Sequence, residues 1–350
     1  MFKDPVTLYG SSISYFTGKM ENYFRVKEIS YEQKVLSYPR FERTMKKKVG
    51  IHQMPAVELP DGRWMTDTTK MIQWFESKIL ENKIIPEDPV QAFFAFLLED
   101  WADEWFGRYA FSSRWCYPHN IEHVALGFYA NAMGKFMHEG LTPEEQAEAV
   151  QRITEVRDNF GLRACANRGC GPDQATAVKA DFQSLMVHVD AHYQQHGFLL
   201  GERASLGDFT FAGLFKAHMA ADPEPRSWVE ASAPALLETM ERLFQARSDD
   251  GQYLANDELP TTLAPLFTHM RDTYHQFLLV SREALAAGEK WCEVDLGEGL
   301  VRMRSLKYSE VSRCHIRDEI EGLSPAQRAD VNRVLGPMGV LDAYRLPPVL

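Results

Sequence analysis

The chain has 350 residues, of which 45% are hydrophobic and 25% are charged, and its formal net charge is −11. This length suits two domains with an appendage. The acidic balance disfavours nucleic acid as a partner, since the one basic run is at 46–48, and no stretch approaches the ~18 apolar residues of a membrane helix. Five scattered cysteines, and a start that resembles neither a signal peptide nor a transit segment, favour reduced thiols in the cytoplasm.

The first 85 residues predict an α/β unit. β-branched and aromatic runs predict strands, and a Pro-Asp-Gly turn between two such runs predicts a hairpin. Apolar residues spaced by three and four predict helices, and Asp67 is a helix N-cap. The expected order is therefore strand, helix, strand, helix, hairpin, helix. The strands are expected at 5–9 and 29–36, the hairpin at 54–66, and helices at 17–27 and after Asp67.

Residues 82–90 contain two prolines and predict a linker. From there to about 250 the strand signals vanish, and helices are expected at 91–110, 143–160 and 175–196. Ser205 and Asp208 then form a capping-box variant before a helix that is apolar almost all round, so this helix should be buried.

Beyond residue 255 the chain predicts a mixed helix and hairpin extension. A long helix is expected at 261–287, a hairpin at 291–306 around the 297–299 turn, and a further helix after Ser324. The sequence leaves the role of this extension open.

Three motifs carry a resemblance to a known family. The first is SYFTGKMENYFRVKEISYE, in which Ser14 precedes Lys19 by five residues. The second is HQMPAVELPDGRWMTDTTKMIQWFE, and the third is LLGERASLGDFTFAGLF. With the order of elements, they make residues 5–250 resemble a soluble glutathione transferase of the serine type. The motifs depart from the family in having Thr68 where serine is usual and Met54 where valine is usual.

The resemblance implies a thioredoxin-like glutathione-binding domain at 1–85, an all-helical substrate domain at 90–252, and an extension at 255–350. It implies that Ser14 faces the thiol of glutathione, with Tyr15 as second candidate because one residue of alignment slip exchanges them. It also implies a cis Pro55. The remaining contacts to glutathione would come from Gln53, the backbone of Met54, Asp67 at the γ-glutamyl ammonium and Thr68 at its carboxylate.

The physical task at Ser14 is to lower the pKa of a thiol. A free thiol has a pKa of ~8.5, and lowering it by about two units requires roughly 2.7 kcal/mol of preferential thiolate stabilisation. A helix N-terminus and one donated hydrogen bond can contribute this. The alternative is that Ser14 only caps a helix. Other hydroxyls nearby are those of Tyr9, Ser11, Ser12 and Thr17.

Two further patterns have competing interpretations. Trp101, Trp105 and Tyr109 correspond to the family's electrophile pocket, but an aromatic stripe at helical spacing is equally typical of a core. Histidines at 188, 192 and 196 and the cysteine pair at 165 and 170 have spacings seen in metal sites. Neither set is completed by further ligands, so no metal is expected.

The sequence therefore predicts a glutathione transferase that uses glutathione as co-substrate, attacks a small apolar electrophile, acts in detoxification and forms a homodimer. Conjugation, ether cleavage, dehalogenation and isomerisation share the thiolate step, so the reaction subtype stays open. The alternative is a non-catalytic binding module of the same fold, with the extension docking a partner.

Overall fold

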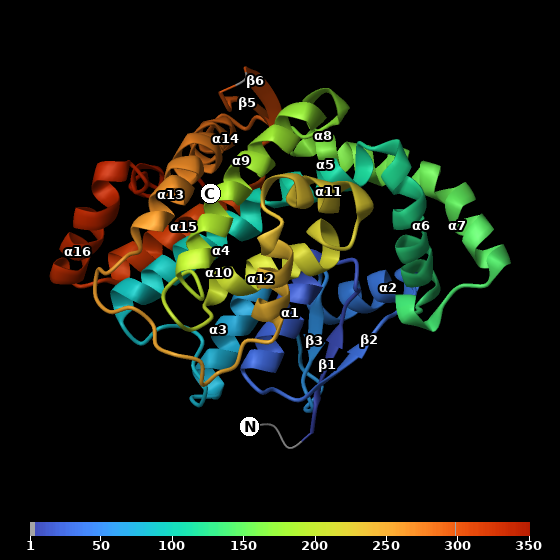
Figure 1. Cartoon of the computed structure of the whole chain (residues 1–350), viewed down its shortest axis with the longest axis horizontal. Coiled ribbons are helices and arrows are strands. Elements are labelled where there is room, and N and C mark those ends of the chain that lie inside the picture. Colours follow the sequence, from blue (N-terminus) through green and yellow to red (C-terminus); the bar gives the residue numbers. More distant parts are fainter. Residues whose placement is uncertain (1–3, 298) are drawn as a thin grey trace.

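A computed structural model describes residues 4–297 and 299–350. Its N-terminal unit lies beside a larger helical body, with the strands at the lower centre of Figure 1. Strand β1 pairs in parallel with β2 and antiparallel with β3, which pairs antiparallel with β4, giving the order β2-β1-β3-β4. This is the expected thioredoxin-like unit. Its elements are β1 Val6–Tyr9, α1 Tyr15–Val26, β2 Tyr31–Lys34, α2 Tyr38–Val49, β3 Ala56–Glu58, β4 Trp64–Thr66 and α3 Thr68–Lys78.

The connection from β1 to α1 is a tight loop that needs a glycine. A Cβ atom added to Gly10 would lie 2.4 Å from Cγ2 of Thr17, so no larger residue fits there without a shift. The Thr17 hydroxyl accepts a hydrogen bond from the Ser11 N–H at 3.2 Å, which closes the loop onto the first turn of α1. The loop therefore holds the start of α1 in a fixed place.

The second domain is helical, as the sequence predicts. The expected helix at 91–110 is in fact two helices, because the chain changes direction at Phe106, where α4 ends and α5 begins. The capping box of Ser205 and Asp208 is present. The α-helices are α4 Pro89–Trp105, α5 Gly107–Trp115, α6 Pro118–Met133, α7 Pro143–Val156, α8 Leu162–Asn167, α9 Ala175–Gln195, α10 Leu206–Leu214, α11 Pro223–Ser232 and α12 Ala235–Phe244.

Helices α1 and α10 join the two domains by a close crossing of glycines. A Cβ on Gly213 would lie 2.6 Å from the backbone nitrogen of Lys19, and one on Gly18 would lie 3.1 Å from Cα of Gly213. Below this crossing, the fully buried Lys19 ammonium pairs with Glu99 at 2.6 Å and with Asp103. One ammonium thus faces two carboxylates inside the domain junction, and burial together with Glu99 raises the pKa of Asp103 to about 6.

The extension adds α13 Ala264–Met270, α14 Gln276–Ala286, β5 Trp291–Asp295, β6 Leu300–Arg304, α15 Lys307–Gly322 and α16 Pro325–Leu335. The predicted long helix is present, with a π-helical turn between α13 and α14. The predicted hairpin pairs Trp291 with Arg304 at its open end, and Glu298 of its turn lies outside the described residues. Figure 1 places the hairpin at the top of the molecule and α16 at its left edge.

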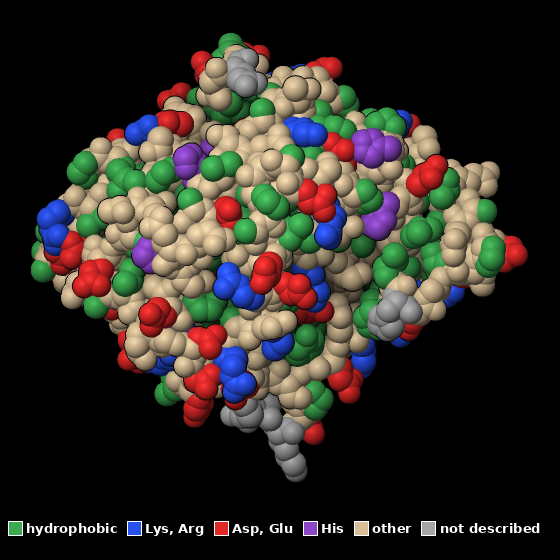
Figure 2. All heavy atoms as spheres, viewed as in Figure 1, with side chains coloured by type: hydrophobic (Ala, Val, Ile, Leu, Met, Phe, Trp, Pro, Cys, Tyr) green, Lys and Arg blue, Asp and Glu red, His purple; other side chains and the backbone are tan. Residues whose placement is uncertain are grey.

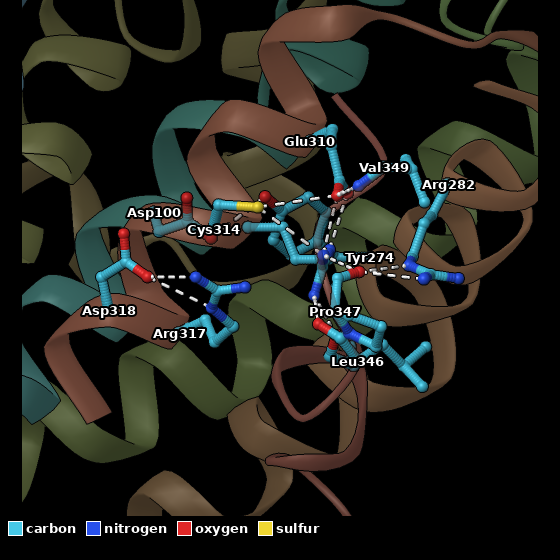
Figure 3. A network of polar contacts seen from close by, with 12 residues as sticks. Asp100, Tyr274, Arg282, Glu310, Cys314, Arg317, Asp318, Leu346, Pro347 and Val349 are labelled. Atoms are coloured by element: carbon cyan, nitrogen blue, oxygen red, sulfur yellow. Dashed lines mark hydrogen bonds and ion pairs between the residues drawn. The ribbon is translucent and has the colours of Figure 1, made fainter. Parts of the chain in front are cut away.

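The extension shares the core of the helical domain. Phe267, Met270 and Tyr274 have no exposed surface and belong to the same hydrophobic cluster as residues of both domains. Its C-terminal segment returns onto α15 (Figure 3). There the buried Arg313 binds Glu310 through Nε at 2.7 Å and Nη2 at 2.8 Å, and donates to the carbonyl oxygens of Ala343 and Leu346.

Acidic and basic side chains alternate over the face seen in Figure 2, and hydrophobic ones are scattered across it. Within the described residues, no helix combines the length and the apolar character that a bilayer crossing requires.

Candidate functional site

A cavity of about 1050 Å³ lies where the N-terminal unit, the helical domain and the extension meet. Its wall includes the loop before α1, the segment before β3, the start of α3, the facing sides of α4 and α5, and the chain from β6 to α15. This volume is at the upper end of the range for small-molecule sites. The site is therefore large enough for two small ligands side by side.

Ser14 is the N-cap of α1 and lines this cavity. Its Oγ accepts a hydrogen bond from the Thr17 N–H at 3.3 Å. A hydroxyl that accepts in this way keeps its own proton to donate, and the start of the helix contributes a partial positive charge beside it. Ser14 thus caps the helix, as the structural alternative expects, and its hydroxyl proton remains available at the edge of the cavity.

The neighbouring hydroxyls are engaged elsewhere. Tyr9 donates to Glu58 at 2.9 Å, and Tyr15 donates to the carbonyl oxygen of Ala102 at 3.0 Å. Burial raises the pKa of Tyr15 well above its ordinary value. Ser11 is buried and accepts from Asn131. Ser11 also keeps its proton, but it is 1% exposed, whereas Ser14 is only partly buried, so Ser14 is the more accessible donor of the two.

The segment before β3 forms the next part of the wall. The Met54–Pro55 bond is cis, as the family resemblance implies, and the carbonyl oxygen of Pro55 accepts from the Thr66 hydroxyl at 3.1 Å. Gln53, Met54 and Pro55 all line the cavity. In the described part of the chain, the Gln53 amide has no hydrogen-bond partner, so it is available to a ligand.

Asp67 and Thr68 line the cavity at the start of α3. Asp67 caps the helix with a φ of 74°, a value that non-glycine residues seldom adopt and that is more frequent at functional sites. Its carboxylate accepts from Tyr308, an extension residue, at 3.0 Å, and lies 3.5 Å from the Lys70 ammonium. Thr68 is buried, and its hydroxyl is unpartnered among the described residues.

The wall opposite α3 is acidic. Burial, and then the carboxylates of Asp100 and Asp103, raise the pKa of Glu104 to about 8. Burial likewise raises the pKa of Asp103 to about 6, against the opposing effect of Lys19. At neutral pH Glu104 is thus mostly a neutral acid facing the cavity, since its pKa lies above the pH.

Of the three aromatic residues predicted for the electrophile pocket, one borders the cavity. Trp105 lines the cavity. Trp101 and Tyr109 do not line the cavity and have no exposed surface, so they belong to the helical core. There Trp101 packs on His269, and the Tyr109 hydroxyl donates to Asp181 at 2.7 Å. Phe111 and Phe277 take their places beside Trp105.

No group of three or more potential metal-ligating side chains has the geometry of a metal site in the described part of the chain. His192 is buried and contacts the Thr262 hydroxyl, whereas His188 is exposed. Cys165 and Cys170 are buried free thiols.

Several cavity residues were missed by the sequence prediction. They are Glu104, Arg108, Arg168, Arg304 and Tyr308. Arg304 and Tyr308 belong to the extension, to which no motif assigned a role. Arg108 and Glu104 lie within the predicted aromatic helix, where only the aromatic residues were considered.

Residues 8–82 match a family model described as "Glutathione S-transferase, N-terminal domain". With the thioredoxin-like order of elements, this match identifies residues 8–82 as a domain of the glutathione S-transferase N-terminal type. The first domain is the one that carries the family signature. None of the curated proteins compared with the chain is significantly similar to it in sequence.

Solved structures with a similar arrangement are distant in sequence. A glutathione S-transferase of Ceriporiopsis subvermispora in complex with glutathione is 15% identical, with 69% of this chain and 98% of that one covered and a TM-score of 0.46. The β-etherase LigF of Sphingobium sp. strain SYK-6 is 19% identical, with 68% and 100% covered and a TM-score of 0.40. At such identities a likeness concerns the fold alone.

Proposed function

We propose that the protein is a glutathione transferase that activates the thiol of glutathione at Ser14 and presents it to an electrophile held against Trp105. The observation that carries this proposal is the convergence of Ser14, Gln53, Met54, Asp67 and Thr68 on one cavity. These residues come from three separate segments of the first domain. Each occupies the position that the family resemblance assigns to glutathione recognition.

In this proposal the tripeptide lies along the segment before β3. The backbone of Met54 pairs with its cysteinyl unit, and Gln53 binds its backbone. Thr68 and the N–H groups that open α3 hold the γ-glutamyl carboxylate, because a helix N-terminus attracts anions. Asp67 meets the ammonium group. This arrangement directs the sulfur towards Ser14 at the start of α1.

Catalysis then consists of nucleophile activation and positioning. Ser14 donates to the thiolate, and the N-terminus of α1 stabilises its charge. The electrophile occupies the remaining volume beside Trp105, Phe111 and Phe277. Conjugation, ether cleavage, dehalogenation and isomerisation all begin from this thiolate. The resemblance also implies a cytoplasmic location and a homodimer. Light scattering after size-exclusion chromatography tests the homodimer.

The test is to measure glutathione binding by calorimetry, and conjugation of a generic electrophile, for the parent and for Ser14→Ala. The proposal expects binding by both proteins and a loss of turnover in the variant. Binding without turnover by either protein would favour the alternative, a non-catalytic module of the same fold. Absence of binding by the parent would overturn the assignment.

A further inference from the structure

Three arginines line one continuous part of the cavity wall, where α5, α8 and β6 meet. Arg108 on α5 donates from Nε to the carbonyl oxygen of Arg168 at 3.1 Å and from Nη2 to that of Gly169 at 3.2 Å. A Cβ on Gly169 would lie 2.4 Å from Cγ1 of Val301 and 2.8 Å from Cγ of Met303, so β6 packs directly on this loop. Arg304 follows Met303 and faces the same cavity.

These arginines are not neutralised. Within the described residues, none of Arg108, Arg168 and Arg304 forms an ion pair, whereas two other arginines of the wall do: Arg114 with Asp222 and Arg152 with Glu148. Arg108 is only 4% exposed, yet its Nη1 has no hydrogen-bond partner in the described part of the chain. A buried guanidinium with an unused donor beside a cavity is a site for an anionic ligand group.

The carboxylates nearby do not supply the negative charge that would neutralise these arginines. Glu104 faces Arg168, but with a pKa of about 8 it is mostly protonated at neutral pH. Asp67 accepts from Tyr308, and Asp103 is paired with Lys19. Glu155 also borders the cavity and, like Arg304, is exposed; within the described residues it forms no ion pair with the three arginines. The excess positive charge is local, since the chain as a whole has a net charge of −11.

Aromatic rings lie directly beneath two of the guanidinium groups. The Arg108 Cζ is 4.5 Å from the centre of the Trp105 ring, and the Arg168 Cζ is 4.4 Å from that of Phe111. Such stacking fixes the plane of a guanidinium. Arg108 uses its Nε and Nη2, and Arg168 donates from Nη1 to the carbonyl oxygen of Ala164 at 3.4 Å, so the donors left for a carboxylate are Nη1 of Arg108 and Nε and Nη2 of Arg168. Phe111 is only partly buried and offers an apolar surface to a planar ligand, whereas Trp105 is 1% exposed and lies beneath Arg108.

We propose that the electrophile taken by this cavity is an organic acid, a planar apolar molecule whose carboxylate binds Arg168 and Arg304, with Arg108 beneath them. This proposal rests on the glutathione transferase function proposed above and names its substrate class. Arg168 and Arg304 are specificity-determining residues: they hold the end of the electrophile that carries the carboxylate. The reacting carbon at the other end then faces the sulfur at Ser14.

The test uses two electrophiles of the same shape, one anionic and one neutral: a chlorodinitrobenzoate and the matching chlorodinitrobenzamide. With either one, the glutathione thiolate forms a carbon–sulfur bond at the ring carbon that bears chlorine. The carbon–chlorine bond breaks, chloride leaves, and the thiol proton passes to solvent. The ratio of kcat/KM for the acid to that for the amide measures the contribution of the anionic group.

We expect this ratio, corrected for the uncatalysed rates, to be about ten or more in the parent, because hydrogen bonds to charged groups are among the strong ones. Arg168→Gln and Arg304→Gln should each reduce it severalfold, mainly through KM for the acid. Arg302→Gln is the matched control. It lies two residues from Arg304 on β6, over the Trp291 ring and outside the cavity wall, and it should leave the ratio unchanged.

Failure of this inference differs from failure of the proposed function. If both electrophiles are conjugated equally well, or if the arginine variants reduce both rates alike, the acid specificity is wrong and the transferase function stands. If neither is conjugated, calorimetry with the two ready-made glutathione conjugates decides. Tighter binding of the acid conjugate, lost in Arg168→Gln, would support the anionic site. Equal or absent binding would overturn it.

Discussion

The side chain of Asp67 links two parts of the chain that are distant in sequence. It opens α3 in the first domain, and its carboxylate accepts a hydrogen bond from Tyr308 at the start of α15. Tyr308 also lines the cavity. If Asp67 meets the ammonium of glutathione, the extension orients a ligand-binding group of the first domain. This contact is the most direct link between the extension and the proposed activity.

Removing the Tyr308 hydroxyl should weaken glutathione binding. Tyr308→Phe keeps the ring but deletes the donor to Asp67, and a hydrogen bond of this kind contributes about 0.5–1.5 kcal/mol. We expect the Kd for glutathione, measured by calorimetry, to rise roughly threefold to tenfold, with little change in kcat.

Tyr117→Phe is the control for this variant. It also removes a part-buried hydroxyl, one that donates to the carbonyl oxygen of Ala175 at 3.2 Å away from the cavity, and it should leave the Kd unchanged. Equal affinities of the parent and Tyr308→Phe would contradict the proposed role of the contact.

Helix α4 is the element on which the extension docks. The buried carboxylate of Asp100 accepts hydrogen bonds from Tyr274 at 3.0 Å, from Ser312 and from Tyr344 at 3.5 Å, and all three donors belong to the extension. Burial nevertheless raises the pKa of Asp100 to about 6, because the three hydroxyls do not replace the lost water completely. The docking point is therefore sensitive to pH.

The raised pKa of Asp100 determines whether the stability of the protein rises or falls with pH. The folded protein binds the Asp100 proton more tightly than the unfolded chain, so this stabilisation is complete below the ordinary pKa of 3.8 and is lost as the pH rises through about 6. Asp103 contributes in the same direction. Together with Glu104, these two groups lower the free energy of unfolding between pH 5 and pH 8, whereas the buried His192 and His275, whose pKa values are lowered by burial, raise it over the lower part of this range. The Asp100 contribution is therefore measured, with denaturant, as the difference between the parent and a variant at this position.

Two substitutions at Asp100 separate charge from hydrogen bonding. Asp100→Asn retains an acceptor without the charge, so the decrease in stability from pH 5 to pH 8 should be smaller than in the parent. Asp100→Ala removes the acceptor of three hydroxyls, of which those of Tyr274 and Tyr344 are buried, and should cost about 1–3 kcal/mol at either pH. The same pH dependence in the parent and in Asp100→Asn would contradict the assignment to this side chain.

The elements that the sequence predicts well are those with local signals. The Pro-Asp-Gly hairpin, the Asp67 cap and the Ser205 capping box each depend on a few adjacent residues, and all are present. Helix α15 was not predicted, because its buried face includes Ser309, Glu310 and Arg313 and so lacks an apolar period. Polar faces of this kind are recognised only once their long-range partners are known.

At the scale of the whole molecule, the extension is part of the core that the helical domain needs. Tyr274 and Phe277 on its first long helical segment pack against Trp105, which also forms part of the cavity wall. The cavity therefore has walls from all three segments. The sequence motifs pointed to the Ser14 and Asp67 side of this cavity. They did not reveal the arginine side, which depends on contacts between α5, α8 and β6.

A chain that ends at residue 254 should not fold. Leu266, Phe267, Met270 and Tyr274 are fully buried, and each such side chain contributes about 1.5–3 kcal/mol. Their sum is comparable with the whole stability of a typical domain, about 5–15 kcal/mol. We expect the truncated protein to be insoluble or to lack a cooperative thermal transition in circular dichroism. A soluble, cooperatively folding product would show that the extension is an independent appendage.

The central claim is that Ser14 and the N-terminus of α1 stabilise a bound thiolate. The direct measurement is a pH titration of the thiolate absorbance of glutathione bound to the parent and to Ser14→Ala. We predict a thiol pKa about two units below the ~8.5 of a free thiol in the parent, and a return of at least about one unit in the variant as the donated hydrogen bond is lost. Titration of bound glutathione at its free value, or an identical midpoint in both proteins, would contradict the account.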